Sequence, residues 1–145
     1  DTDMVGPYGY CADISRTYVE GNKFNDNQKK LYSMAVDQIN FNSRLIKPGM
    51  SFKEFTEKSW VLPEEYYGNR YSVMVHGIGL CDEWPAIRYP TDGGERTGRF
   101  ESNMTITVES YIGKVGGKEG VKLEQQYLVG QNGLELMSHH PLEDI

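Results

Sequence analysis

Five acidic residues and one histidine stand where such side chains are uncommon. His76 follows an apolar run and precedes a turn with two glycines, which let the backbone approach a ligand closely. Glu109 and Glu124 each interrupt a stretch of β-branched and apolar residues, where an unpaired buried carboxylate is costly. The other acids of interest lie near the start of the chain and are Asp1, Asp3 and Asp13.

Carboxylates that converge without cations repel one another, so this set of residues predicts bound metal ions. An oxygen-rich set with one imidazole suits iron, manganese, cobalt or zinc better than a thiolate site would. Two ions that share carboxylates can activate a water molecule or hold a substrate carboxylate. The alternative interpretation is that these acids face solvent on the open side of a sheet.

The elements that position these residues follow from hydrophobic periodicity and turn residues. A helix is expected over residues 25–45, with Asn25 as its N-cap, and a second helix from the capping box at 51–54 to about residue 60. Strands are expected over residues 10–19, 71–76, 104–111 and 120–129, turn-like segments over 61–70 and 89–99, and one short turn or strand after residue 130. Two helices against several antiparallel strands indicate an α+β fold.

Composition narrows the class of protein. The 145 residues make one domain, with 38% hydrophobic and 25% charged residues. A net charge of −6 argues against a nucleic-acid partner, and no apolar run is long enough for a membrane span or a signal peptide. Two cysteines make no disulfide framework, so a cytoplasmic location is expected. The chain starts without methionine and looks like a fragment.

Five motifs occur in one order: Asp-x-Asp, Gly-Tyr-x-x-Asp-Ile-Ser-Arg-Thr, His-Gly-Ile-Gly, Thr-Val-Glu-Ser and Val-Lys-Leu-Glu-Gln. This pattern resembles the pita-bread metallohydrolase family, which includes methionine aminopeptidase, aminopeptidase P, prolidase and creatinase. The resemblance implies a curved antiparallel sheet with flanking helices, and makes residues 1–145 the C-terminal part of a catalytic domain that is incomplete at its N-terminus. It also implies a homodimer and two divalent metal ions. The ligands implied are Asp1, Asp3, Asp13, His76, Glu109 and Glu124.

Two departures from the peptidase pattern stand out. The two metal aspartates of the peptidases are usually eleven residues apart, whereas Asp13 follows Asp3 by ten and Asp1 by twelve, which leaves the first ligand open between them. The methionine aminopeptidases also carry another histidine after the glycine turn, and here Asp82 and Glu83 stand in its place. A carboxylate cannot stabilise an oxyanion, but it can take a proton from carbon.

The segments His-Gly-Ile-Gly-Leu-Cys-Asp-Glu-Trp-Pro, Asp-Thr-Asp-Met-Val-Gly and Glu-Gly-Val-Lys-Leu-Glu-Gln-Gln are similar to a lyase branch of the same family. That branch cleaves dimethylsulfoniopropionate to dimethyl sulfide and acrylate by β-elimination. The resemblance implies an iron-type centre, Asp82 as catalytic base and Tyr71 in the substrate pocket. Because aromatic faces bind diffuse cations such as a sulfonium, Tyr71 and Trp84 are the expected substrate-binding residues.

Two other functions stay open. One is a metal-dependent Xaa-Pro aminopeptidase or dipeptidase of the same fold, and the other is a binding module that has lost its metals. Among the remaining residues, Cys81 is expected to pack as a small apolar side chain, and Arg16 to pair with an acid behind the site. His139 and His140 are expected at the surface.

Overall fold

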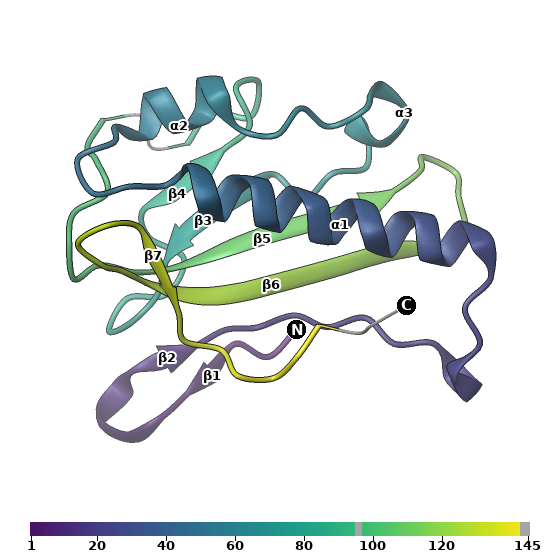
Figure 1. Cartoon of the computed structure of the whole chain (residues 1–145), viewed down its shortest axis with the longest axis horizontal. Coiled ribbons are helices and arrows are strands. Elements are labelled where there is room, and N and C mark those ends of the chain that lie inside the picture. The colour runs from purple at the N-terminus through teal and green to yellow at the C-terminus, as the bar shows by residue number, and fades with distance from the viewer. Residues whose placement is uncertain (95–96, 143–145) are drawn as a thin grey trace.

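The computed structural model describes residues 1–94 and 97–142. A long helix, α1 (Asp26–Leu45), lies across one face of a five-stranded antiparallel sheet (Figure 1). The strands of that sheet, in spatial order, are β4 (Ala86–Arg88), β3 (Val73–Gly77), β5 (Thr105–Gly113), β6 (Gly120–Val129) and β7 (Leu134–Leu136). A separate two-stranded ribbon is formed by β1 (Met4–Val5) and β2 (Cys11–Ala12). Short 3₁₀ turns occupy Pro7–Gly9 and Glu20–Asn22.

The start of α1 is set by a reciprocal cap, as the sequence predicted for its N-cap residue. The Gln28 backbone N–H donates to the Asn25 side chain at 2.8 Å, and the Gln28 side chain accepts from the Asn25 N–H at 2.9 Å. The buried face of the helix, which includes Ala35 and Ile39, packs against β5 and β6. This contact forms the hydrophobic core and covers only one side of the sheet.

The two longest strands alternate between the two faces of the sheet. Ile106, Val108 and Ile112 of β5 belong to the core beneath α1. The alternate residues Thr107 and Glu109 therefore point to the opposite face. They are buried there as well, so this second face has its own cover and a polar interior.

The cover comes from the segment that follows β2, and here the sequence prediction was wrong. A strand was expected over residues 10–19, but only Cys11–Ala12 is a strand. The segment instead runs along the free edge of β6, where the Ser15 carbonyl accepts from the Glu124 N–H at 3.1 Å. The Thr17 hydroxyl accepts from the Lys122 N–H at 3.0 Å and donates to its carbonyl at 2.7 Å. Side chains thus replace most of a regular ladder.

The second helix, α2 (Phe52–Lys58), starts as predicted, because the Glu54 N–H donates to the Ser51 hydroxyl at 3.1 Å. Within the segment predicted to be turn-like lies the four-residue helix α3 (Glu64–Tyr67), too short to show a helical period. The three-residue strand β4 was not predicted at all. It pairs with β3 on the outer edge of the sheet.

The loop expected at 89–99 is confirmed except at residues 95–96, which lie outside the described residues, as residues 143–145 of the tail do. The short strand expected after residue 130 is β7. In the described part of the chain, no helix combines the length and the apolar character that a membrane crossing requires.

Candidate metal centre

The register of the sheet brings three of the predicted ligands together on the face away from α1. Glu109 of β5 stands directly opposite Glu124 of β6. His76 of β3 stands opposite Thr107, which is two residues before Glu109 and on the same face. The ladder of backbone hydrogen bonds therefore fixes how close the imidazole and the two carboxylates come.

Asp13 reaches the same place from the covering segment. Its backbone N–H donates to the Gln126 side chain at 3.4 Å, and the Asp3 N–H donates to its Oδ1 at 3.4 Å. Asp3 has a positive φ of 26°, a conformation that L-residues rarely adopt. The two aspartates thus meet at the base of the β1–β2 ribbon.

His76 lies at the centre of these acids. Its Nε2 is 3.2 Å from Glu124 Oε1, 3.3 Å from Glu109 Oε1 and 3.8 Å from Asp13 Oδ2. All four residues are at most 2% exposed. The His76 Nδ1 bonds to the Gly77 carbonyl at 2.9 Å. Such a bond fixes the ring and directs its other nitrogen to a ligand.

The donor set fits a divalent cation. One ligand atom each of Asp13, His76 and Glu124 lie within 4.8 Å of one another. Glu109 Oε1 and Glu124 Oε1 are buried and have no hydrogen-bond partner, which is costly for a carboxylate unless a cation binds there. Asp1, Asp3 and Asp13 make a second group of the same dimensions, so Asp13 belongs to both. Carboxylate oxygens with one imidazole are ligands for first-row transition metals.

The pKa values of the buried acids and of His76 in this cluster are shifted from their ordinary values. Burial and repulsion from Glu124 raise the pKa of Asp13 to about 7 and that of Glu109 to about 8. Burial also opposes ionisation of Glu124, but the neighbouring His76 imidazole and the charge of Lys122 hold its pKa below the ordinary value. Burial opposes protonation of His76, yet the nearby Glu124 carboxylate and the bond to the Gly77 carbonyl raise its pKa to about 9. The carboxyl groups in this cluster thus outnumber the cationic side chains that could neutralise them.

Two residues that sequence reasoning missed belong to this cluster. The Lys122 ammonium lies 2.6 Å from Asp1 Oδ2 and 3.1 Å from Glu109 Oε2. The Ser15 hydroxyl is 2.6 Å from Asp1 Oδ1 and 3.0 Å from Glu124 Oε2. The spacing of the strand residues could have indicated Lys122, because residues two apart on one strand share a face and Lys122 precedes Glu124 by two.

The predicted base and aromatic residues lie outside the two candidate ligand groups. Asp82 is half-buried in the loop between β3 and β4, and its Oδ1 accepts from the Glu83 N–H at 3.0 Å. Neither candidate ligand group includes it. The Tyr71 ring lies 4.7 Å from the Lys122 ammonium, whereas Trp84 is 60% exposed. The roles of all three residues stay predictions.

Two sequence-based expectations about neighbouring residues were wrong. Arg16 donates to the carbonyls of Glu124 and His140 and to the Gln125 side chain, and within the described residues it has no carboxylate partner. It thus ties the C-terminal tail to β6. Cys81 is an exposed free thiol rather than a packed side chain. His139 and His140 are exposed, as expected.

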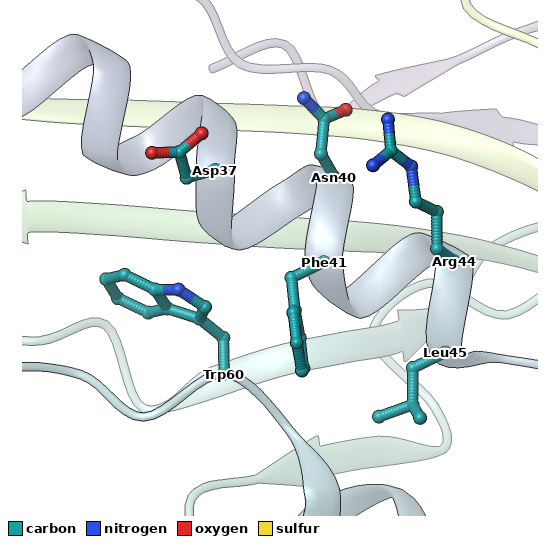
Figure 2. A pocket seen from close by; sticks show the side chains of 6 residues that line it. All are labelled: Asp37, Asn40, Phe41, Arg44, Leu45 and Trp60. Atoms are coloured by element: carbon teal, nitrogen blue, oxygen red, sulfur yellow. The ribbon is translucent and has the colours of Figure 1, made fainter.

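A wide, open hollow of about 650 Å³ lies elsewhere, between the outer side of α1 and the segment after α2 (Figure 2). It contains none of the cluster residues. The residues that line it are Asp37, Asn40, Phe41, Arg44, Leu45 and Trp60. The chemistry of the polar face therefore does not extend to this hollow.

Comparison with known proteins agrees with this geometry. Residues 2–131 match metallopeptidase family M24. Over 99% of its length the chain is 37% identical to dimethylsulfoniopropionate lyase DddP of Roseovarius nubinhibens, and it covers 33% of that protein. It is 32% identical to the Xaa-Pro dipeptidase of Pyrococcus furiosus, over 89% of this chain and 36% of that protein. The chain thus spans about a third of the length of these relatives.

Solved structures give the same picture. The prolidase of Pyrococcus horikoshii superimposes with a TM-score of 0.75 at 27% identity, over 94% of this chain and 38% of that one. The X-Pro aminopeptidase of Thermotoga maritima superimposes with a TM-score of 0.71 at 28% identity, over 92% and 37%. The helices and antiparallel sheet described above are therefore part of the pita-bread fold.

Proposed function

Because this chain belongs to metallopeptidase family M24, we propose that it forms the metal centre of a dimethylsulfoniopropionate lyase. The observation that carries the proposal is its similarity to two DddP lyases, at 37% and 36% identity over 99% of the chain. The Xaa-Pro dipeptidases of two Pyrococcus species match at 32% and 33% over 89% and 86%. Asp82 supports the same choice, since the methionine aminopeptidases, which the sequence resembles, carry a histidine as donor after the glycine turn.

Two divalent ions, iron in the first instance, would be held by the two ligand groups that share Asp13. Asp13, His76 and Glu124 would hold one ion, and Asp1 and Asp3 would complete the second. Glu109, whose buried Oε1 lies 3.3 Å from His76 Nε2, would add a further oxygen to the first. When bound, the ions supply positive charge that fixes the substrate carboxylate and favours loss of the neighbouring proton. The orphaned oxygens of the two glutamates are the structural basis for this assignment.

The chemistry itself is assigned to Asp82. Its carboxylate takes a proton from the carbon next to the substrate carboxylate, and the released electron pair forms the carbon–carbon double bond. The carbon–sulfur bond breaks, dimethyl sulfide leaves with its electron pair, and acrylate remains. The loop of Asp82 lies against the ribbon that leads to Asp13, because the Cys11 N–H donates to the Gly79 carbonyl at 2.8 Å.

Aromatic faces would hold the sulfonium end of the substrate. The Lys122 ammonium already lies over one face of the Tyr71 ring, so that face is taken by a cation of the chain itself. Trp84 is exposed on the loop that carries Asp82, and its indole is the larger and more electron-rich surface. We therefore assign the main sulfonium contact to Trp84 and a wall of the pocket to Tyr71.

The direct test is headspace detection of dimethyl sulfide from dimethylsulfoniopropionate, beside release of proline from an Xaa-Pro dipeptide. The Asp82→Asn variant should lower kcat for dimethyl sulfide by about 10²–10⁴-fold with its metal content unchanged. Glu83→Gln, one residue away and exposed, is the matched control and should keep activity near that of the wild type. Loss of metal from Asp82→Asn would make Asp82 a ligand rather than a base.

A second candidate function rests on the match to the archaeal Xaa-Pro dipeptidases and prolidases. In that case the same metal cluster would serve hydrolysis of a peptide bond before proline. Proline release without dimethyl sulfide would decide for the peptidase and against the lyase.

A further inference from the structure

The structure places one lysine inside the acid cluster. Lys122 of β6 stands two residues before Glu124, and Glu109 faces Glu124 across the strand pair, so all three share one sheet face. The ammonium is 3.1 Å from Glu109 Oε2 and 3.9 Å from Glu124 Oε2. It also reaches Asp1 Oδ2 at 2.6 Å. Within the described residues, it is the only lysine or arginine that pairs with these acids.

The ammonium and the imidazole lie on opposite sides of the paired glutamates. The Oε1 atoms of both glutamates face His76 Nε2, at 3.3 and 3.2 Å, and are the atoms without a hydrogen-bond partner. The Oε2 atoms of both face Lys122. Each carboxylate therefore presents one oxygen to the side where a metal fits and the other to a cation that the chain itself supplies.

Tyr71 also holds the Lys122 ammonium. The Tyr71 ring lies 4.7 Å from the ammonium, a favourable cation–π distance. The lysine side chain is 23% exposed, which leaves it a path toward solvent. The ammonium thus lies within the cluster, and its side chain can still move toward solvent.

We propose that Lys122 is an internal counter-cation of the metal centre, which holds the ligand carboxylates in place before metal binds and competes with the metal for them. This role rests on the proposed metal centre and not on the identity of the substrate. In the metal-free protein the ammonium pairs with Asp1, attracts the Glu124 carboxylate and lies beside Glu109 Oε2. With divalent ions among the same carboxylates, the ammonium is repelled at short range.

The two effects are linked thermodynamically. A side chain that stabilises the metal-free state more than the metal-loaded state must lower metal affinity by the difference. Lys122 therefore makes the empty centre stable and the bound metal exchangeable. A residue that only oriented the ligands would act in the opposite direction, because loss of such a residue weakens metal binding by about 10–100-fold.

The test uses Mn²⁺ alone, added to metal-free protein and followed by titration calorimetry and by thermal unfolding in EDTA and in Mn²⁺. Lys122→Met keeps a stem of similar shape against Tyr71 and removes the charge. It should lower the Mn²⁺ dissociation constant by about tenfold or more, since a unit charge a few ångströms away is removed. Its melting temperature should fall in EDTA and change little in saturating Mn²⁺.

Two further variants separate charge from packing. Lys122→Arg keeps the positive charge and should keep the Mn²⁺ affinity close to that of the wild type. Lys114→Met removes an exposed lysine that pairs with Glu65 at 3.0 Å, away from the cluster. It should leave Mn²⁺ binding unchanged.

Weaker Mn²⁺ binding by Lys122→Met would overturn the competition and make the lysine an orienting residue. An equal loss of melting temperature in EDTA and in Mn²⁺ would overturn it too, by showing a purely structural role. Failure of the wild type to bind Mn²⁺ would refute the proposed metal centre, and this inference with it. A wild type that binds Mn²⁺ but makes no dimethyl sulfide would refute only the lyase and leave this inference standing.

Discussion

Replacing Glu109 by glutamine should make the metal-free protein more stable while it removes a metal ligand. Glu109 is 1% exposed, and burial together with repulsion from Glu124 raises its pKa to about 8 from 4.5. In the folded protein this group holds its proton at a pH where the unfolded chain has released it. Its contribution to the free energy of unfolding is therefore lost as pH rises from about 4.5 to about 8.

The size of the effect follows from that interval. A pH of 7 lies about 2.5 units above the ordinary pKa of 4.5 and below the folded pKa of about 8, and each unit is worth about 1.4 kcal/mol, so at pH 7 the penalty is about 3 kcal/mol. Glutamine has the same shape and no charge, and its side-chain oxygen can still accept from Lys122. Glu109→Gln should therefore raise the free energy of unfolding by up to about 3 kcal/mol, or about 6–12 °C for a domain of this size.

The assay is thermal and urea unfolding at pH 5, 7 and 8, in EDTA and in Mn²⁺. In EDTA the gain from Glu109→Gln should be small at pH 5 and largest at pH 8. In Mn²⁺ the order should reverse at pH 7, because at a metal concentration of about 1,000 times its dissociation constant the wild type gains about 4.1 kcal/mol, more than the penalty of about 3 kcal/mol, and the variant gains far less. Glu57→Gln on the exposed face of α2 is the control, and it should show neither change.

A metal-free Glu109→Gln protein that is less stable than the wild type at pH 7 and 8 would refute this reasoning. That result would mean that the carboxylate is stabilised as an ion in the empty centre. The raised pKa would then be absent in solution, and the acids would not be in conflict without metal.

Three further outcomes follow from the same cluster. The folded pKa values of Asp13, Glu109 and His76 all lie above their ordinary values. The melting temperature of the metal-free protein should therefore fall as the pH is raised from about 4 to about 9. A melting temperature that rises over this range would contradict these shifts. In Mn²⁺ the trend should be opposite, since metal binds deprotonated ligands. His76→Ala should abolish the Mn²⁺-dependent rise in melting temperature, and a full rise would exclude the imidazole as a ligand. Gly77→Ala should lower the free energy of unfolding by about 1–3 kcal/mol or more, because the added Cβ would lie 2.1 Å from the Trp84 carbonyl oxygen. Urea unfolding identical to that of the wild type would show that Gly77 and Trp84 are not so closely packed.

Local signals were enough for several elements. The bounds of β6 and the N-cap of α1 were predicted correctly, because an apolar strand between glycines and an Asn-capped helix are decided by neighbouring residues. The alternation along β5 and β6 also decided that Glu109 and Glu124 each point away from the apolar face. The elements that were missed, α3 and β4, are short, and only contacts with distant segments stabilise them.

The candidate site shows the same division. The sequence by itself determined which residue types are available for metal chemistry: carboxylates interrupting apolar strands, one imidazole after a strand, and an aspartate shortly after that imidazole. Only the tertiary structure decided how they meet, through the register that sets Glu109 against Glu124 and the docking of Asp13 beside Gln126, 113 residues away. It also decided that a lysine enters the cluster. Such arrangements depend on hydrogen bonds between segments far apart in the chain, and local periodicity carries no information about them.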